Sequence, residues 1–416
     1  MLHHSYYIVS VNTELGILLL STISGSIIKL DEIKYQSLFK DDFSIFTEYE
    51  MRVLKKLCFV TENEERALIN KNRYDAVYNK TNKNLGLTIL TTSECNARCY
   101  YCYEKGILNQ KMSFDVADKI IEYVSKNYKN YRLHISWFGG EPLINYKIID
   151  YISNRLNNLG ISFFSTMISN SSLFDLISDE QFDIWNLKKV QITLDGVYNC
   201  YDNIKNYKSK DIHFIDIIRN AHRLISYGIA IHFRLNFNPE KVDDTLNIIE
   251  FLHKEFGNNS LIKIYPAWIV SMGIKSPADY ESNRNPILKI YEKLIDYGYI
   301  KSFDYFGVKY RTVHCGAFKK YIVIAPDGAL YKCEHVVKNS ECKIGEIGSG
   351  ISNDMSFNKW VNPNLIMEKC EQCLFLPSCE GGCKDMIFDG KEEYACVPIK
   401  YYIEDIIKIC YSKGVR

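Results

Sequence analysis

Residues 85–298 repeat one pattern six times, in which an apolar run of strand length is followed by a stretch with helical periodicity. Strands that alternate with helices pair in parallel and are joined by right-handed crossovers. We therefore expect an α/β sheet or an incomplete barrel. The expected strands span 85–90, 133–138, 162–168, 190–194, 230–237 and 261–267, and the expected helices lie near 114–128 (N-cap Ser113), 143–158, 172–186, 212–226, 240–256 and 284–298.

A smaller α+β segment precedes these units. Short apolar runs predict strands at 6–11, 15–20 and 26–30. A Thr-x-x-Glu sequence is typical of a capping box at the start of a helix. Thr47 with Glu50 and Thr61 with Glu64 therefore predict helices near 48–57 and 62–79. The segment turns helical directly after the third strand, so we expect a small module of three strands and three helices in about 80 residues.

Charge and composition argue against two classes of partner. The 416 residues include 51 basic and 50 acidic side chains without a block of like charges, so the electrostatic footprint of a nucleic-acid-binding protein is missing. The N-terminus lacks the basic region of a signal peptide, and the apolar stretch 15–28 is broken by polar residues. We expect a cytoplasmic protein that binds neither nucleic acid nor membrane.

Fourteen cysteines are many for a cytoplasmic chain. Disulfides belong to oxidising compartments, so metal binding is the better explanation. Cys58, Cys200 and Cys410 stand apart from the others and fit small buried hydrophobic residues. The remaining cysteines form one triplet and one dense C-terminal set.

The triplet Cys95, Cys99 and Cys102 has the spacing C-x3-C-x2-C and directly follows the first barrel strand. Full protein ligation of a four-iron cluster takes four cysteines, so three would leave one iron open. An open iron can bind an amine and a carboxylate, and a reduced cluster can transfer an electron into the C–S bond of a sulfonium. A structural zinc site is the alternative, which the unequal gaps and the missing fourth ligand disfavour.

Chemically suited residues also follow the other expected strands, where an α/β barrel builds its active site. Two glycines at 139 and 140 allow close approach of the backbone to a ligand, and Glu141 can bind an ammonium group. The further strand-end residues are Ser169, Asn170, Ser171, Asp195, Gly196, Arg234 and Asn236. We expect all of these groups to converge on one mouth of the barrel.

These residues and their spacing resemble the radical S-adenosylmethionine superfamily over about residues 85–270. The resemblance implies a partial (β/α)6 barrel of the TIM type, with Cys95, Cys99 and Cys102 as cluster ligands. It further implies that S-adenosylmethionine contacts Tyr101, Gly139, Gly140, Glu141, Asn170, Asp195, Arg234 and Asn236. One departure concerns a turn that usually reads Thr-Asn-Gly and here reads Ser169-Asn170-Ser171.

The C-terminal cysteines resemble the SPASM extension of that superfamily, which carries two auxiliary clusters. The resemblance implies three [4Fe-4S] clusters in the chain. It assigns Cys315, Cys333 and Cys383 to the nearer auxiliary cluster and Cys370, Cys373, Cys379 and Cys396 to the outer one. The fourth ligand of the nearer cluster is Cys342, a more distant cysteine, or none, which would leave an iron open for a substrate thiolate.

Glu334, directly after Cys333, lies where some relatives carry an acidic catalytic base. A solvated loop glutamate is the alternative for this residue. A zinc ribbon that only stabilises the tail is the alternative for the later cysteines, although it would not explain the first triplet.

The layout of the front module resembles a winged-helix-like peptide-recognition element, which captures a leader peptide as an added strand; a simple stabilising cap is the alternative. We expect domains at 1–82, 83–304 and 305–416. The expected function is maturation of a ribosomally made precursor peptide, by a thioether or another crosslink, with a flavodoxin- or ferredoxin-type electron donor. The alternatives are a formylglycine-forming sulfatase maturase and a zinc-stapled peptide-binding protein.

Overall fold

The computed structural model describes residues 1–14, 16–78, 81–104, 109–269, 277–310, 315–318, 320–337, 339–362 and 366–415. The chain divides into two compact units. Unit 1 comprises Met1–Asn79, Ser276–Phe318 and Asn362–Arg416, and unit 2 comprises Lys80–Lys275 and Lys319–Val361.

A ten-stranded sheet forms the centre of unit 2, in the order β11-β10-β9-β8-β7-β6-β12-β13-β14-β15. Every neighbouring pair from β11 to β12 is parallel, which confirms the six predicted parallel strands. The last three strands add antiparallel. The bounds are β6 Asn84–Thr92, β7 Arg132–Gly139, β8 Phe163–Ser169, β9 Leu187–Leu194, β10 Ala230–Phe237, β11 Ile262–Trp268, β12 Tyr321–Ile324, β13 Ala329–Tyr331, β14 Gly345–Glu346 and β15 Gly350–Ile351.

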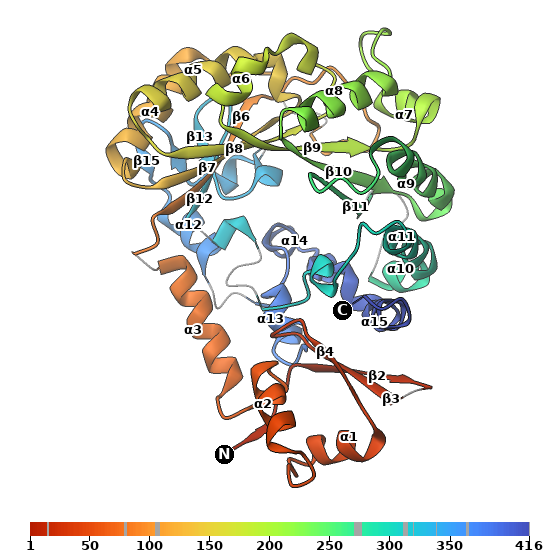
Figure 1. Ribbon diagram of the computed structural model, residues 1–416. Coiled ribbons are helices and arrows are strands. Elements are labelled where there is room, and N and C mark those ends of the chain that lie inside the picture. Colours follow the sequence, from red (N-terminus) through yellow and green to blue (C-terminus); the bar gives the residue numbers. More distant parts are fainter. Residues whose placement is uncertain are drawn as a thin grey trace. The chain divides into compact units, whose positions relative to one another are not determined.

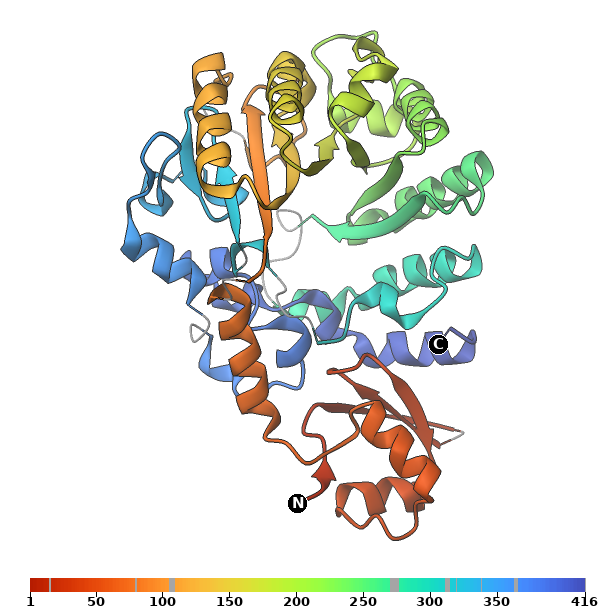
Figure 2. The ribbon, with the colours of Figure 1, turned by 60° about the vertical axis from the view of Figure 1, so that its left-hand side comes forward.

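Helices cover one face of this curved sheet (Figures 1 and 2). They are α4 Phe114–Tyr128, α5 Tyr146–Asn158, α6 Asp179–Ile184, α8 Phe214–Ser226 and α9 Val242–Phe256, and α12 Asp354–Val361 follows β15. Ser113 is the N-cap of α4 as predicted, because its hydroxyl accepts from the N–H of Val116 at 3.2 Å. The apolar residues of each helix face the sheet, and this burial is the main stabilising term of the unit.

One helix prediction was wrong, and one helix was missed. The single helix expected near 172–186 is a 3-10 turn, Phe174–Leu176, followed by the short α6. Ser178 and Gln181 form a capping box there, so a helix begins at Asp179 and does not continue from the preceding residues. A further helix, α7 Tyr198–Lys205, was not predicted at all.

Unit 1 begins with the predicted α+β module. Its elements are β1 His3–His4, β2 Ile8–Thr13, β3 Gly16–Ser21, β4 Ile27–Leu30, α1 Glu32–Phe39, α2 Glu48–Lys56, β5 Val60–Thr61 and α3 Glu65–Tyr78. Strands β2, β3 and β4 form an antiparallel sheet in that order, and β1 pairs with β5. The core contains Leu19, Leu38, Leu54 and Phe59. Leu15, where one expected strand begins, and residue 79, where one expected helix ends, lie outside the described residues.

One of the two predicted capping boxes is present. Thr47 and Glu50 exchange both hydrogen bonds at the start of α2. The second prediction was wrong, because Thr61 belongs to strand β5 and α3 begins later, at Glu65. The Thr61 hydroxyl instead accepts from the N–H of Asn63 at 3.1 Å, which stabilises the turn between strand and helix.

The rest of unit 1 consists of short helices and turns. The helices are α10 Pro277–Ser282, α11 Arg284–Asp296, α13 Leu376–Cys379, α14 Lys384–Phe388 and α15 Ile403–Ser412. Tyr7 and Ile69 of the front module share one hydrophobic cluster with Cys370 and Leu376. The units therefore differ from the segments 1–82, 83–304 and 305–416 expected from sequence, because 1–79 packs with the C-terminal tail while β12–β15 extend the barrel sheet.

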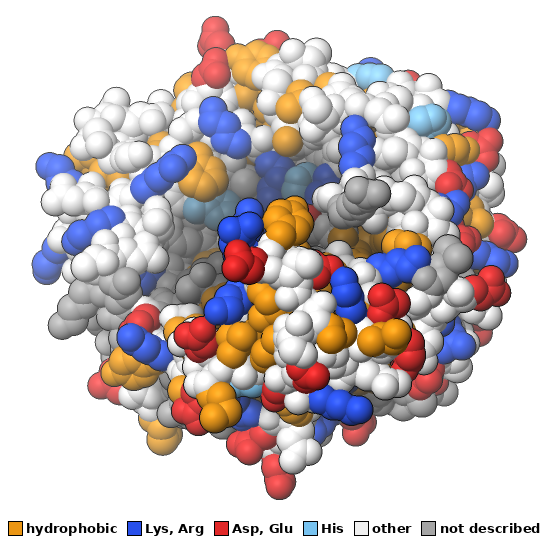
Figure 3. All heavy atoms as spheres, turned by 60° about the horizontal axis from the view of Figure 1, so that its bottom comes forward, with side chains coloured by type: hydrophobic (Ala, Val, Ile, Leu, Met, Phe, Trp, Pro, Cys, Tyr) orange, Lys and Arg blue, Asp and Glu red, His pale blue; other side chains and the backbone are white. Residues whose placement is uncertain are grey.

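The surface agrees with the balanced charge of the chain. On the face drawn in Figure 3, acidic and basic side chains are intermingled. Among the described residues, no helix combines the length and the apolar character needed to cross a bilayer.

Candidate functional site

The first three cysteines lie on the loop that leaves the end of β6. Their thiols are close enough to influence one another electrostatically. Burial raises the pKa of Cys95 to about 12, although the N–H of Ala97 contacts its sulfur at 3.4 Å and opposes the rise. Thiolates at this loop therefore need a compensating positive charge, which a bound cluster would provide. The donor set fits a cluster with three cysteine ligands.

Helix α7 holds this cysteine loop in place. The N–H of Arg98 donates to the carbonyl of Lys205 at 2.8 Å, and the N–H of Lys208 donates to the carbonyl of Asn96 at 2.8 Å. Two backbone bonds from the end of α7 thus fix the segment between the cysteines. The helix was missed because its sequence has only a weak apolar stripe.

The glycine pair after β7 packs directly on the start of the cysteine loop. The N–H of Gly140 donates to Thr92 at 3.0 Å, and the N–H of Glu141 donates to Glu94 at 2.8 Å. A Cβ atom on Gly139 would lie 2.0 Å from the Thr92 carbonyl oxygen, and Gly139 has a φ of +127°. The glycines are therefore required for close contact between two loops of the protein, whereas the sequence suggested close approach of a ligand.

The side chain of Glu141 points into the protein. It is fully buried, and its carboxylate accepts from the Ser169 hydroxyl at 2.9 Å, the Asn170 N–H at 2.8 Å and the Leu143 N–H at 3.2 Å. Burial raises its pKa to about 7 in spite of these bonds. In this arrangement the carboxylate ties the ends of β7 and β8 together.

The turn after β8 continues this network. The Asn170 side chain donates to Asn96 within the cysteine loop at 2.8 Å. Ser171 has a φ of +67°, in the left-handed region that glycine adopts without strain. It occupies the position where the related turn usually has glycine. Its carbonyl accepts from Asn220 at 2.8 Å, and its buried hydroxyl has no partner in the described structure.

We expect Ser171→Gly to stabilise the protein by about 1 kcal/mol, because it removes the steric cost of a Cβ in the left-handed region. The measurement is thermal unfolding of the anaerobically prepared protein. Ser171→Ala is the matched control, since it removes the hydroxyl but keeps the strain. Equal stability of the two variants would show that the backbone strain is not the cause.

Asp195 and Asn236 lie side by side at the ends of β9 and β10. The Asn236 amide donates to Asp195 at 2.8 Å, and the Lys205 ammonium lies 2.9 Å from the other carboxylate oxygen. The side chains of Lys205 and Asp195 are only 4% and 1% exposed, so this is a buried ion pair. Both Asp195 and Asn236 line a cavity of about 330 Å³, together with Tyr100, Ile204, Asn238, Lys241, Asp244, Thr245 and Ile269. Two predicted cofactor contacts are thus brought together at a cavity.

Lys205 also reaches Tyr101, a third predicted cofactor residue, whose hydroxyl lies 3.3 Å from the ammonium. Burial lowers the pKa of Lys205, but the charge of Asp195 and the other groups around it raises that pKa well above the ordinary value. Lys205 therefore stays charged. Sequence reasoning missed this residue because lysines are almost always exposed, and no local signal marks a buried one.

Arg234 lies further from the end of β10 than Asn236 and shares its face of the strand. Its Nε atom is buried and has no hydrogen-bond partner among the described residues. Burial raises the pKa of Tyr265 on the neighbouring strand β11, and the charge of Arg234 opposes this rise. Arg234 is therefore placed in the barrel, two residues below the ends where Asp195 and Asn236 meet.

The four cysteines expected to bind the outer cluster lie around one small cavity of about 20 Å³ in unit 1. These are Cys370, Cys373, Cys379 and Cys396. Burial raises the pKa of Cys379 to about 11. Within the described residues no three His, Cys, Asp or Glu side chains have the spacing that holds a single metal ion. A four-iron cluster takes one thiolate at each iron and so spaces its ligands more widely.

The residues expected near the other auxiliary cluster fall in both units. Cys315 and Cys383 belong to unit 1, whereas Cys333 and Cys342 belong to unit 2. In unit 2, Glu334 accepts from the Tyr321 hydroxyl at 3.4 Å. His335 stacks on Tyr103, with ring centroids 4.5 Å apart, and so joins this turn to the end of the first cysteine triplet.

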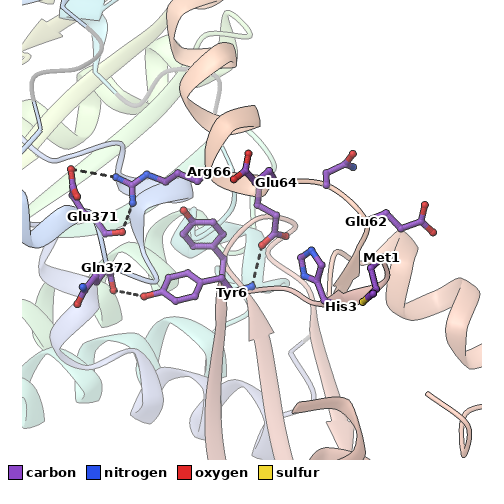
Figure 4. A pocket seen from close by; sticks show the side chains of 11 residues that line it. Met1, His3, Tyr6, Glu62, Glu64, Arg66, Glu371 and Gln372 are labelled. Carbon is purple, nitrogen blue, oxygen red and sulfur yellow. Dashed lines mark hydrogen bonds and ion pairs between the residues drawn. The ribbon is translucent and has the colours of Figure 1, made fainter. Parts of the chain in front are cut away.

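A larger cavity of about 630 Å³ in unit 1 lies where the front module meets the turn between Cys370 and Cys373 (Figure 4). The Tyr6 hydroxyl donates to the carbonyl of Gln372 at 3.0 Å, and the Arg66 guanidinium lies 3.8 Å from the Glu371 carboxylate. The module is thus attached to the loop that carries two of the outer cysteines. No sequence motif marked this attachment.

Comparison with known families gives one match, in which residues 89–252 fit the Radical SAM superfamily. An uncharacterised protein of Methanocaldococcus jannaschii is 31% identical over 147 residues, which is 34% of this chain and 49% of that protein. The match therefore spans about half of that relative. Radical SAM cyclopropyl synthase TigE of Paramaledivibacter caminithermalis is 21% identical over 71% of this chain and 67% of its own length. A cysteine-type anaerobic sulfatase-maturating enzyme of Clostridium novyi is 24% identical over 70% of this chain and 86% of its own length.

Two solved structures share the fold at low sequence identity. The structure of anSMEcpe with bound AdoMet and the Cp18Cys peptide has a TM-score of 0.58 and 16% identity, and covers 80% of this chain and 99% of that one. The structure of Streptococcus suis SuiB bound to the precursor peptide SuiA has a TM-score of 0.54 and 16% identity, and covers 96% of this chain and 99% of that one. The second match extends over nearly the whole chain.

Proposed function

We propose that this chain is a radical SAM enzyme that modifies a ribosomally synthesised precursor peptide, because residues 89–252 match the Radical SAM superfamily and the chain is similar to peptide and sulfatase maturases. The observation that carries this proposal is the single mouth of the barrel. There the turn after β8 is hydrogen-bonded to the cysteine loop, and the Asp195–Asn236 pair is connected to Tyr101 of that loop through the Lys205 ammonium. The likeness to SuiB, which was solved with a precursor peptide, supports the substrate class.

Cys95, Cys99 and Cys102 would hold the first cluster in this proposal. A cluster bound there would supply the electron for reductive cleavage of S-adenosylmethionine and so the radical chemistry that modifies the peptide. The chain's own residues would orient the cosubstrate: the loop Gly139–Glu141 would hold its amine, and Asp195 and Asn236 offer polar groups at the cavity.

The C-terminal cysteines would hold two further clusters. Cys370, Cys373, Cys379 and Cys396 fully ligate the outer cluster in this proposal, in keeping with their common cavity. Cys315, Cys333 and Cys383 would ligate the nearer one. Its fourth iron would be bound by Cys342 or would stay open. Glu334, held by Tyr321, is the proposed base. These clusters would take up the surplus electron or hold a sulfur, and an open iron would favour thioether formation. A flavodoxin- or ferredoxin-type donor would supply the electron that reduces the first cluster.

The front module would bind the leader of the precursor. Strand β4 forms one edge of its three-stranded sheet, and a leader can add beside such an edge as a further strand. Ser26 accepts a hydrogen bond from Ser21 of β3, so by the alternation of an antiparallel ladder Lys29 directs its N–H away from β3. Lys29 is therefore the position at which strand addition can be tested.

The test is anaerobic incubation of the full chain with S-adenosylmethionine, a reductant and each short candidate precursor peptide found in the reading frames next to its gene, followed by mass spectrometry. We expect 5′-deoxyadenosine together with a mass change in the peptide. A leaderless peptide should react at least about tenfold more slowly, because strand addition raises its local concentration at the barrel. Lys29→Pro should produce the same loss with the complete precursor, since proline has no N–H to donate.

Lys29→Ala is the matched control and should react like the natural chain. An unchanged precursor in the presence of abundant deoxyadenosine would contradict the proposed substrate class. Equal rates with and without the leader would leave the module as a stabilising cap.

The sulfatase-maturase relative supports a second candidate, in which a Cys or Ser of a protein substrate is oxidised to formylglycine. Aldehyde-specific labelling of the product separates the two candidates. A formylglycine substrate needs no leader, so the rates measured with leaderless peptide also distinguish them.

A further inference from the structure

The inner face of the barrel carries a group of basic side chains at a distance from the strand ends. On β10, His232 and Arg234 alternate with the fully buried Ile231, Phe233 and Leu235. Alternate residues of a strand point to opposite faces. The apolar residues face the helices α8 and α9, so His232 and Arg234 face the lumen together with Asn236.

The neighbouring strands add further basic residues to the same face. Lys189 of β9 alternates with the buried Val190 and Ile192, and His134 of β7 alternates with buried apolar neighbours. Lys263 of β11 is the register partner of His232. His134 stacks on Phe164 at 4.7 Å and contacts the Thr166 hydroxyl at 3.0 Å. Strands β7, β9, β10 and β11 thus each contribute one member to this basic cluster, defined as His134, Lys189, His232 and Lys263.

The members of the cluster repel one another electrostatically. Burial and the charges of Lys189 and Lys263 lower the pKa of His232 to about 4. Burial and Lys189 lower the pKa of His134, and burial and Lys263 lower that of Lys189. All of these effects have the sign expected of like charges in a partly dehydrated space.

Among the described residues, no carboxylate offsets this repulsion at His134, Lys189 or His232. Neither Lys189 nor His232 forms a hydrogen bond or ion pair with a carboxylate there, and Arg234 just above them has a buried Nε without a partner. Elsewhere in the unit a buried charge is neutralised, as Lys205 is by Asp195. The partly buried Lys189 has no counter-ion there, and a bound anion would stabilise its charge and favour protonation of His232, so the lumen is suited to an anion supplied from outside.

We propose that the basic cluster binds a carboxylate of the substrate, either an Asp or Glu side chain or the C-terminus of a peptide. This inference rests on the proposed function and specifies the substrate class of the same barrel. The rise per residue of a strand gives the distance of this site from the mouth of the barrel. Arg234 lies two residues and His232 four residues below Asn236, which correspond to about 7 Å and about 13 Å. The modified carbon would thus lie between the mouth of the barrel and the bound carboxylate, only a few bonds from it.

The test compares three short peptides on the full chain, with its clusters reconstituted and S-adenosylmethionine present. The probes are acetyl-Ala-Asp-Ala-amide, acetyl-Ala-Asn-Ala-amide and acetyl-Ala-Asn-Ala with a free C-terminus, and binding is measured by anaerobic calorimetry. We expect at least one carboxylate peptide to bind about tenfold or more tightly than the neutral amide, because a charge-assisted hydrogen bond replaces a neutral one. The carboxylate peptide that binds more tightly shows whether the bound carboxylate is a side chain or a C-terminus.

Lys189→Gln combined with His232→Gln should reduce this preference to within about twofold. Lys188→Gln is the matched control, since it removes the same charge from the next residue of β9, which is exposed, and should keep the preference. Equal binding of all three peptides to the natural chain overturns the inference. This comparison uses only the natural chain and so does not depend on whether a variant folds. Deoxyadenosine formation is measured in the same samples: its presence without a carboxylate preference refutes only this inference, whereas its absence refutes the proposed function.

Discussion

Replacing Cys95 with alanine is expected to abolish the formation of 5′-deoxyadenosine, with a loss of at least about a hundredfold. Cys95 is one of only three thiols on the loop after β6, and the loss of one ligand leaves two, which cannot hold a four-iron cluster firmly. The measurement is anaerobic turnover of S-adenosylmethionine with a strong reductant. Iron should fall from about twelve to about eight atoms per chain if three four-iron clusters are present.

Cys58→Ala is the control for this prediction, because Cys58 belongs to neither of the two cysteine sets in the sequence. It should retain the iron content and the turnover of the natural chain. Equal turnover in the Cys95→Ala protein and the natural chain would contradict the assignment of the first cluster. A fall in iron to zero would instead indicate that the variant fails to fold.

Replacing Lys205 with methionine is expected to destabilise the protein by about 3–5 kcal/mol. Methionine has a similar volume, so the loss comes mainly from the Asp195 carboxylate, which would remain buried without its ammonium partner. The Asn236 amide alone cannot neutralise that charge. Thermal unfolding of the reconstituted protein measures the effect.

The double variant Lys205→Met with Asp195→Asn should recover a large part of the lost stability, because it removes the unpaired charge. Lys210→Met, on the exposed segment that follows α7, is the matched control and should change stability by less than about 0.5 kcal/mol. If the double variant were less stable than Lys205→Met alone, the buried ion pair would not be the source of the effect.

Local patterns account for the features that were predicted correctly. The six parallel strands follow from apolar runs of the right length, and the capping box at Thr47 follows from a spacing of three residues. Such signals depend on residues a few positions apart. They failed where two local rules competed, as at Thr61, where strand pairing with β1 prevailed over helix capping.

The amino-acid sequence by itself determined the alternation of strands and helices and the positions of the cysteines, since periodicity and spacing are properties of neighbouring residues. Only the tertiary structure decided that Tyr321 pairs with Gly86, that Lys205 is buried against Asp195, and that the basic residues of four strands share one lumen. These contacts join residues far apart in the chain, and the free energy of burying a charge depends on what surrounds it in space. No local pattern encodes those surroundings.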